Sequence, residues 1–142
     1  MGLHWFHHDV DASADFAIRK LMALQGNAGY GTWWLLCEQL AQQPGYCYPV
    51  ANEVDRALLA QSLNLSGAEL DGFLATLADL GLIRGLDDGA IYNERFLRDA
   101  QQYEASLELS AKRRLAGSKG GRRSGEVRRA RAQALADAND DI

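Results

Sequence analysis

The sequence contains few of the residues that cross-link or stiffen a chain: of its 142 residues, two are cysteine and two are proline. Two thiols do not make a disulfide framework, and Cys37 lies in an apolar run, so we interpret Cys37 and Cys47 as reduced. The N-terminus lacks the basic start and apolar core of a signal peptide, and no stretch approaches the roughly 18 consecutive apolar residues of a membrane span. We therefore expect a cytoplasmic protein with no membrane partner.

The sequence also lacks the motifs of common enzymes. It has no Gly-x-x-x-x-Gly-Lys-Ser/Thr phosphate-binding loop, no zinc-protease motif and no nucleophile elbow. All three histidines, His4, His7 and His8, lie near the N-terminus beside Asp9 and Asp11. Because a metal site usually draws ligands from a second segment, we favour a capping and packing role for this region. The sequence predicts that the protein is not an enzyme and uses neither a cofactor nor a metal.

Charge is distributed unevenly along the chain, which has a formal net charge of −4. Residues 112–131 contain nine basic residues and a single acid, Glu126, and therefore carry +8. Residues 1–111 carry −9, and residues 132–142 carry −3. A basic segment attached to an acidic body indicates a polyanionic partner, most simply nucleic acid.

The apolar periodicity of the first fifty residues predicts two helices and a short strand. Ser13 caps a first helix over about residues 14–24, which ends at Gly26. A second helix covers about residues 29–42, and a β-prone segment follows at 46–50. The bulky face of the second helix, which we interpret as the main contributor to the core, consists of Tyr30, Trp33, Trp34, Cys37 and Leu40.

The next forty residues predict two helices and a hairpin. Asn52 caps a third helix, and Ser66-Gly67-Ala68-Glu69 has the form of a capping box that opens a fourth helix over about residues 68–80. Two short apolar runs, 82–84 and 90–92, flank an Asp-Gly turn and indicate a β-hairpin. The apolar positions of the third helix are Val54, Ala57, Leu58 and Leu63.

Asn93 caps a last helix, whose apolar positions continue to Tyr103 and Leu107 and predict packing at least that far. Four glycines after residue 116 predict that no continuous helix crosses the basic segment. The order helix, strand, helix, helix, hairpin is the winged-helix arrangement. We therefore predict a mainly α fold with a small β-hairpin: a winged helix-turn-helix domain over residues 1–110, followed by a flexible basic arm over residues 111–142.

Five short motifs, in their order and spacing, resemble a known group. They are His8-Asp9-Val10-Asp11-Ala12, Gly29-Tyr30-Gly31 with Trp34, Gly45-Tyr46, Asn93-Glu94-Arg95-Phe96-Leu97 and Ala116-Gly117-Ser118-Lys119-Gly120-Gly121. Over about residues 4–125 the chain resembles the N-terminal domain of phage and prophage replication proteins, the replisome-organiser or DnaD-like winged-helix group. The resemblance implies a phage-type DNA-binding protein of DNA replication initiation.

The charge pattern predicts where duplex DNA makes contact. The fourth helix, which a helix-turn-helix places in the major groove, contains Glu69, Asp71 and Asp79 and no lysine or arginine. Because attraction to phosphate dominates affinity, we expect the basic arm to lead the contacts, with arginines forked onto phosphates or inserted into a narrow minor groove. The candidate nucleic-acid-binding residues are Lys112, Arg113, Arg114, Lys119, Arg122, Arg123, Arg128, Arg129 and Arg131.

The sequence leaves several alternatives open. RNA could replace DNA as the partner, although no aromatic residue interleaves the basic residues to stack unpaired bases. A second hypothesis is that the protein is a winged-helix transcriptional regulator. A third is an adaptor or inhibitor that binds a host replication protein or another host enzyme through its acidic face. Tyr103 and Leu107 could also extend an apolar seam to a second copy, which would make a homodimer.

Overall fold

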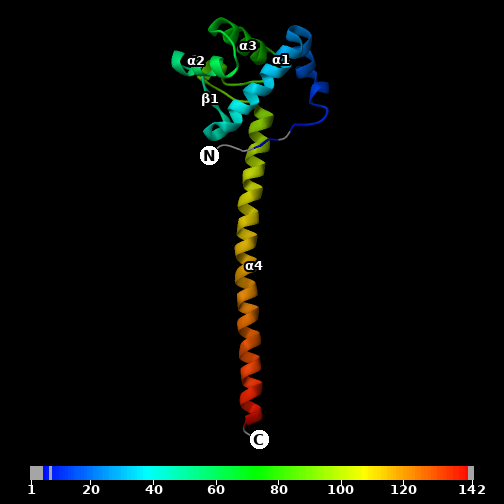
Figure 1. Cartoon of the computed structure of the whole chain (residues 1–142), viewed down its shortest axis with the longest axis vertical. Coiled ribbons are helices and arrows are strands. Elements are labelled where there is room, and N and C mark those ends of the chain that lie inside the picture. The colour runs from blue at the N-terminus through cyan, green and yellow to red at the C-terminus, as the bar shows by residue number, and fades with distance from the viewer. Residues whose placement is uncertain (1–4, 7, 141–142) are drawn as a thin grey trace. The chain divides into compact units, whose positions relative to one another are not determined.

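The computed structural model describes residues 5–6 and 8–140 (Figure 1). Helices make up 78% of the described residues, which also form one two-stranded antiparallel sheet. This confirms the prediction of a mainly α fold with a small β-hairpin. The chain divides into two compact units, residues 1–100 and 101–142, and each is described by itself below.

The helix α1 spans Phe16–Gln42 and contains the break that the sequence predicts between its first two helices. At Gly26 the backbone is non-helical, with φ 66° and ψ −160°, a conformation that glycine adopts far more readily than other residues. The predicted cap at Ser13 is wrong, because Ser13 lies in the 3-10 turn Ala12–Ala14. Asp15 caps α1 instead: its carboxylate accepts hydrogen bonds from two first-turn N–H groups at 3.0 and 3.2 Å.

The helix-turn-helix consists of α2, Glu53–Ser62, and α3, Gly67–Asp79. Asn52 caps α2 as predicted. The predicted capping box is also formed, with Ser66 and Glu69 exchanging hydrogen bonds of 3.0 and 3.1 Å. Hydrogen bonding from the backbone N–H of Ser66, and then from its side chain, lowers the pKa of the Glu69 carboxyl, because it stabilises the ionised form.

The face of α2 that packs into the core differs from the prediction. Leu59, Ala60 and Leu63 are buried, whereas Val54 and Leu58 remain 69% and 52% exposed. Val54 with Leu58 and Leu59 with Leu63 are two apolar pairs with helical spacing on adjacent faces of α2. Periodicity alone does not show which of the two pairs is buried. Contacts of α2 with α1 and α3 decide which face is buried.

The sheet pairs β1, Tyr48–Pro49, with β2, Ala90–Ile91, in antiparallel orientation. The first strand is shorter than predicted because Pro44–Tyr46 forms a 3-10 turn. The predicted hairpin is closed by one bridge, in which Arg84 and Tyr92 exchange backbone hydrogen bonds of 2.8 and 3.1 Å. The order α1, β1, α2, α3, hairpin is that of a winged helix, as predicted.

The core of the first unit lies between α1, α2, α3 and the hairpin. Trp33 is 5% exposed and Trp34 is partly buried, which confirms their predicted place at the core. Phe6 also packs there, whereas the neighbouring Trp5 is 62% exposed. Cys37 is buried and free, and burial raises the pKa of its thiol to about 12, so it stays neutral.

The helix α4 runs from Glu94 to Asp140. Asn93 caps it as predicted, because its side-chain oxygen accepts a hydrogen bond of 2.7 Å from the N–H of Phe96. The predicted packing as far as Leu107 is wrong: Ala100 is 3% exposed, whereas the Leu107 side chain is 52% exposed.

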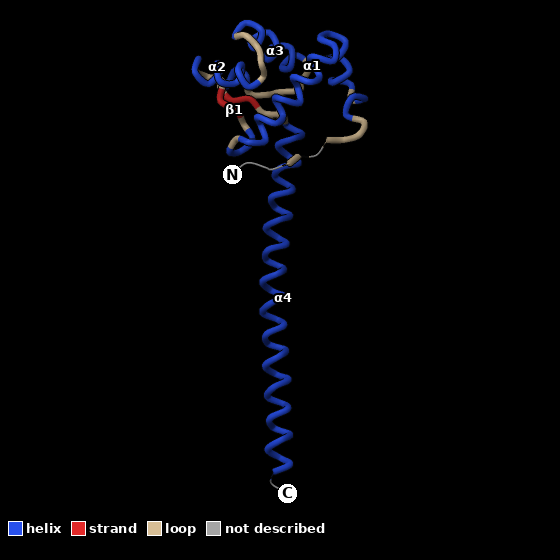
Figure 2. Tube along the Cα trace, viewed as in Figure 1, coloured by secondary structure: helices blue, strands red, loops and turns tan. Residues whose placement is uncertain are grey.

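The prediction that glycines interrupt the basic segment is also wrong. The second unit continues α4 without a break in the described residues, through Gly117, Gly120, Gly121 and Gly125 (Figure 2). Glycine costs about 1 kcal/mol relative to alanine in a helix, but its backbone accepts helical angles. The surrounding alanine, leucine, lysine and arginine residues are strong helix formers, and they outweigh these costs.

Candidate nucleic-acid interface

The second unit presents its basic residues on a helix. The nine predicted nucleic-acid-binding residues, between Lys112 and Arg131, all lie on α4, and all are exposed. At 1.5 Å per residue, this stretch is roughly 30 Å long. None of the nine forms an ion pair with a described residue, and Arg129 makes one long hydrogen bond of 3.4 Å, to the Gly125 carbonyl oxygen. Their charge is therefore available to a partner.

The cations surround the helix and do not form a single stripe. With 3.6 residues per turn, residues seven apart return to nearly the same side. Lys112 and Lys119 share one side in this way, and Arg122 and Arg129 share another. Arg123 lies on the side of Lys112 and Lys119, and the remaining sides are occupied by Arg113, Arg114, Arg128 and Arg131. An element charged on all sides suits a site in which anions lie on more than one side of the helix.

The same segment lacks an apolar seam. Its large apolar residues after Leu107, namely Leu109, Leu115, Val127 and Leu135, are between 48% and 69% exposed. Their spacings of 6, 12 and 8 residues do not repeat the heptad pattern that a coiled coil needs. The second unit is therefore better suited to a charged partner than to helix pairing, and the homodimer remains a prediction.

One acid interrupts the positive segment. Glu126 lines a shallow hollow on the helix surface together with Lys119, Gly120, Arg122 and Arg123. Residues three or four apart are neighbours on a helix, so this carboxylate lies beside the cations of the preceding turn. It lowers the local positive potential where phosphates would approach.

The helix-turn-helix has the opposite electrostatic character. Its acids on α3 face no compensating lysine or arginine from α3 itself. Arg56 of α2 is held by Asp71, with 2.5 Å between Nη2 and Oδ1, and its Nη1 donates to the Val50 carbonyl oxygen at 3.1 Å. In the wing, Arg84 pairs with Glu94 at 3.2 Å. The prediction from charge that these elements offer little attraction to phosphate is consistent with this geometry.

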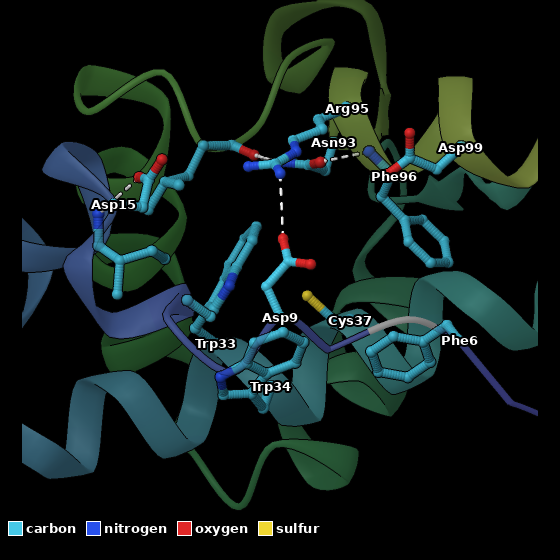
Figure 3. A pocket seen from close by; sticks show the side chains of 13 residues that line it. Phe6, Asp9, Asp15, Trp33, Trp34, Cys37, Asn93, Arg95, Phe96 and Asp99 are labelled. Atoms are coloured by element: carbon cyan, nitrogen blue, oxygen red, sulfur yellow. Dashed lines mark hydrogen bonds and ion pairs between the residues drawn. The ribbon is translucent and has the colours of Figure 1, made fainter.

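Sequence reasoning missed a cavity of about 140 Å³ in the first unit (Figure 3). Its walls combine four aromatic rings with three carboxylates and one guanidinium. They come from the N-terminal segment, α1 and the start of α4, which are far apart in the sequence. The aromatic rings belong to Phe6, Trp33, Trp34 and Phe96, and the charged groups belong to Asp9, Asp15, Arg95 and Asp99.

The described residues contain neither a metal-ligand cluster nor a membrane-spanning helix. No group of three or more histidine, cysteine, aspartate or glutamate side chains lies close enough to hold a metal ion. No described helix combines the length and apolar character needed to cross a membrane. Of the three histidines, His4 and His7 lie outside the described residues, and His8 stacks on Trp34 with ring centroids 3.8 Å apart.

Comparison with known proteins gave one match. The family model described as Lin1244/Lin1753-like, N-terminal, matches residues 5–95. This region includes the cavity's N-terminal segment and the whole helix-turn-helix, and it ends before the basic segment. No curated protein and no solved structure matches the chain.

Proposed function

From the premise that the chain belongs to the Lin1244/Lin1753-like family through its N-terminal domain, we propose that it binds duplex DNA through the basic part of α4. The observation that carries this proposal is the +8 charge on residues 112–131, exposed on a helix and unpaired within the described residues. The first unit, residues 1–100, has a net charge of −7 and would repel phosphates, which also favours the basic part of α4 as the contact surface.

A helix with cations on all sides fits the major groove. The groove is about 12 Å wide, and a helix with its side chains is about 10–12 Å across. Phosphates line both edges of the groove, so arginines on opposite sides of α4 reach different strands. Continuous basic helices are an established way of entering the major groove. The major groove of A-form RNA is deep and narrow, so the helical form favours DNA over RNA.

Binding is expected to be strongly salt-dependent and weakly sequence-selective, because phosphate contacts carry little sequence information. If six to nine cations engage, the plot of log K against log salt has a slope of about −5 to −8.

Duplex binding by the full chain and by a chain ending at Ser110 tests the assignment. The shorter chain should lose most of its affinity and most of its salt dependence. If the two chains bind with equal affinity and equal salt slope, the helix-turn-helix is the interface and the proposal is wrong. A double-stranded RNA of the same length provides the comparison for DNA preference.

We propose further that the protein serves phage-type DNA replication. The support is the resemblance of its motifs to replication proteins of that type. Mapping the bound DNA in cells tests this step: protection at a replication origin supports it, and protection confined to promoters would favour a transcriptional regulator. Recovery of one stoichiometric host protein, with no salt-sensitive DNA shift, would favour the adaptor alternative.

A further inference from the structure

We propose that the cavity in the first unit binds a guanidinium group, the side chain of an arginine on another polypeptide. The proposal goes beyond DNA binding and does not depend on it. It concerns a separate surface, formed by residues within the first unit.

The charge of the cavity selects a cation. Three carboxylates line it, those of Asp9, Asp15 and Asp99, against the single guanidinium of Arg95. Arg95 Nη2 donates to Asp9 Oδ2 at 3.0 Å, so the cavity wall already holds one guanidinium of the chain itself. Asp99 is exposed and makes no hydrogen bond or ion pair with any described residue. A carboxylate without a partner among the described residues is therefore left in the cavity lining.

The aromatic walls select a flat cation. Phe6 stacks on Trp34 with centroids 5.8 Å apart and meets Phe96 edge-on at 5.6 Å. Together with Trp33, these rings make up the aromatic part of the cavity lining. A guanidinium is planar, stacks on aromatic faces and is more weakly hydrated than an ammonium, so it loses less on entering such a site. A cavity on the order of 150 Å³ admits a planar group as large as benzene.

The rest of the lining suits the apolar stem of an arginine side chain. The Cys37 thiol at the cavity is neutral and adds to the apolar part of the lining. Ile18 and Leu82 complete an apolar lining that accommodates the methylene groups of the side chain.

The test uses the full chain labelled with ¹⁵N and titrated with N-acetyl-L-arginine methylamide. The chain has three tryptophans, so three indole N–H signals report on binding, and Trp5, which does not line the cavity, is the internal reference. We expect saturable shifts of the Trp33 and Trp34 signals. The neutral isostere N-acetyl-L-citrulline methylamide should bind roughly threefold or more weakly, because it lacks the cation.

Two variants make the test specific. Asp99→Asn should weaken binding roughly two- to fivefold by removing the unpaired carboxylate. Asp79→Asn makes the same change of charge on an exposed residue of α3 that does not line the cavity, and it should leave binding unchanged. Three results would each overturn the proposal. They are binding of the citrulline analogue as tight as that of the arginine amide, wild-type affinity of the Asp99→Asn variant, and a loss of affinity in Asp79→Asn as large as that in Asp99→Asn.

The arginine could come from a second copy of this chain, which has seven arginines in residues 112–131, or from a different protein. Sedimentation of the full chain over a range of concentrations distinguishes these sources. Self-association that the arginine amide reverses assigns the arginine to a second copy. A monomer that still binds the amide assigns it to another protein.

Discussion

Arg56 of α2 joins the two helices of the helix-turn-helix by pairing with Asp71 of α3, with 2.5 Å between Nη2 and Oδ1. The same guanidinium donates to the carbonyl oxygen of Val50, just after β1. This arginine therefore ties the strand to both helices. It is also a cation of the helix-turn-helix whose charge is already neutralised by an acid.

Replacing Arg56 by alanine should lower the free energy of unfolding by about 1–2 kcal/mol. The pair with Asp71 is largely exposed and contributes at most about 1 kcal/mol, and the hydrogen bond to Val50 contributes a similar amount. Asp71→Asn, which keeps the bond to Val50, should cost less than half as much. Urea unfolding of both variants measures the difference, and equal losses would contradict the dual role of Arg56.

The buried thiol of Cys37 makes the free energy of unfolding depend on pH in the alkaline range. Burial, with a contribution from Glu38, raises the pKa of this thiol from 9.0 to about 12 in the folded protein. The folded state therefore keeps a proton that the unfolded state loses above pH 9. Stability should be fully present below pH 9 and fall between pH 9 and 12, at up to about 1.4 kcal/mol per pH unit for one proton.

Urea unfolding of the wild type and of Cys37→Val at pH 8, 9 and 10 tests this dependence. The variant should lose less stability between pH 8 and 10 than the wild type does. Some alkaline loss should remain in the variant, since burial also raises the pKa of Tyr48. Parallel pH profiles for the two proteins would show that the thiol is not responsible.

The glycines of the basic segment distinguish a helical interface from a flexible one. Alanine in place of Gly117, Gly120 and Gly121 meets no other atom within 4 Å, so the triple substitution fits the helix. Each change should stabilise the helix by about 1 kcal/mol. If the segment binds DNA as a helix, the triple variant should bind more tightly, with helicity measured by circular dichroism rising in parallel. Weaker binding would indicate that the segment must bend to bind.

Glu126 is expected to oppose DNA binding. Glu126→Gln removes the single acid from the positive segment without changing its length or its ability to form a helix. Affinity for duplex DNA at low salt should rise about two- to fivefold, an effect of the size expected for one exposed charge. Asp87→Asn, in the wing, is the matched control and should change affinity much less. A gain that survives at high salt would point to a cause other than electrostatics.

Features set by neighbouring residues were predictable from the sequence. The capping box of α3 depends on Ser66 and Glu69, three residues apart, and both of its hydrogen bonds are present. The break at Gly26 follows from the backbone preference of glycine. The position of the positive charge was likewise a matter of counting residues 112–131.

Features set by tertiary contacts were not predictable in the same way. Leu58 and Leu59 are adjacent leucines, and their periodicity did not reveal that Leu59 is the buried one. The ion pair between Asp9 and Arg95 spans 86 positions, and no local pattern marks its partners or the cavity they line. The prediction that the basic segment is not a continuous helix overestimated the free-energy cost of its four glycines. The helix preference of the residues around them is larger than that cost.

The most direct test of the account is the salt dependence of duplex binding by a variant whose seven arginines in residues 112–131 are replaced by glutamine. The wild type should give a slope of log K against log salt of about −5 to −8, and the variant a slope near −2, since two lysines remain. A control with Arg19 and Arg98 of the first unit changed to glutamine should keep the wild-type slope. A variant slope equal to that of the wild type would contradict the assignment of the DNA-binding surface to the basic part of α4.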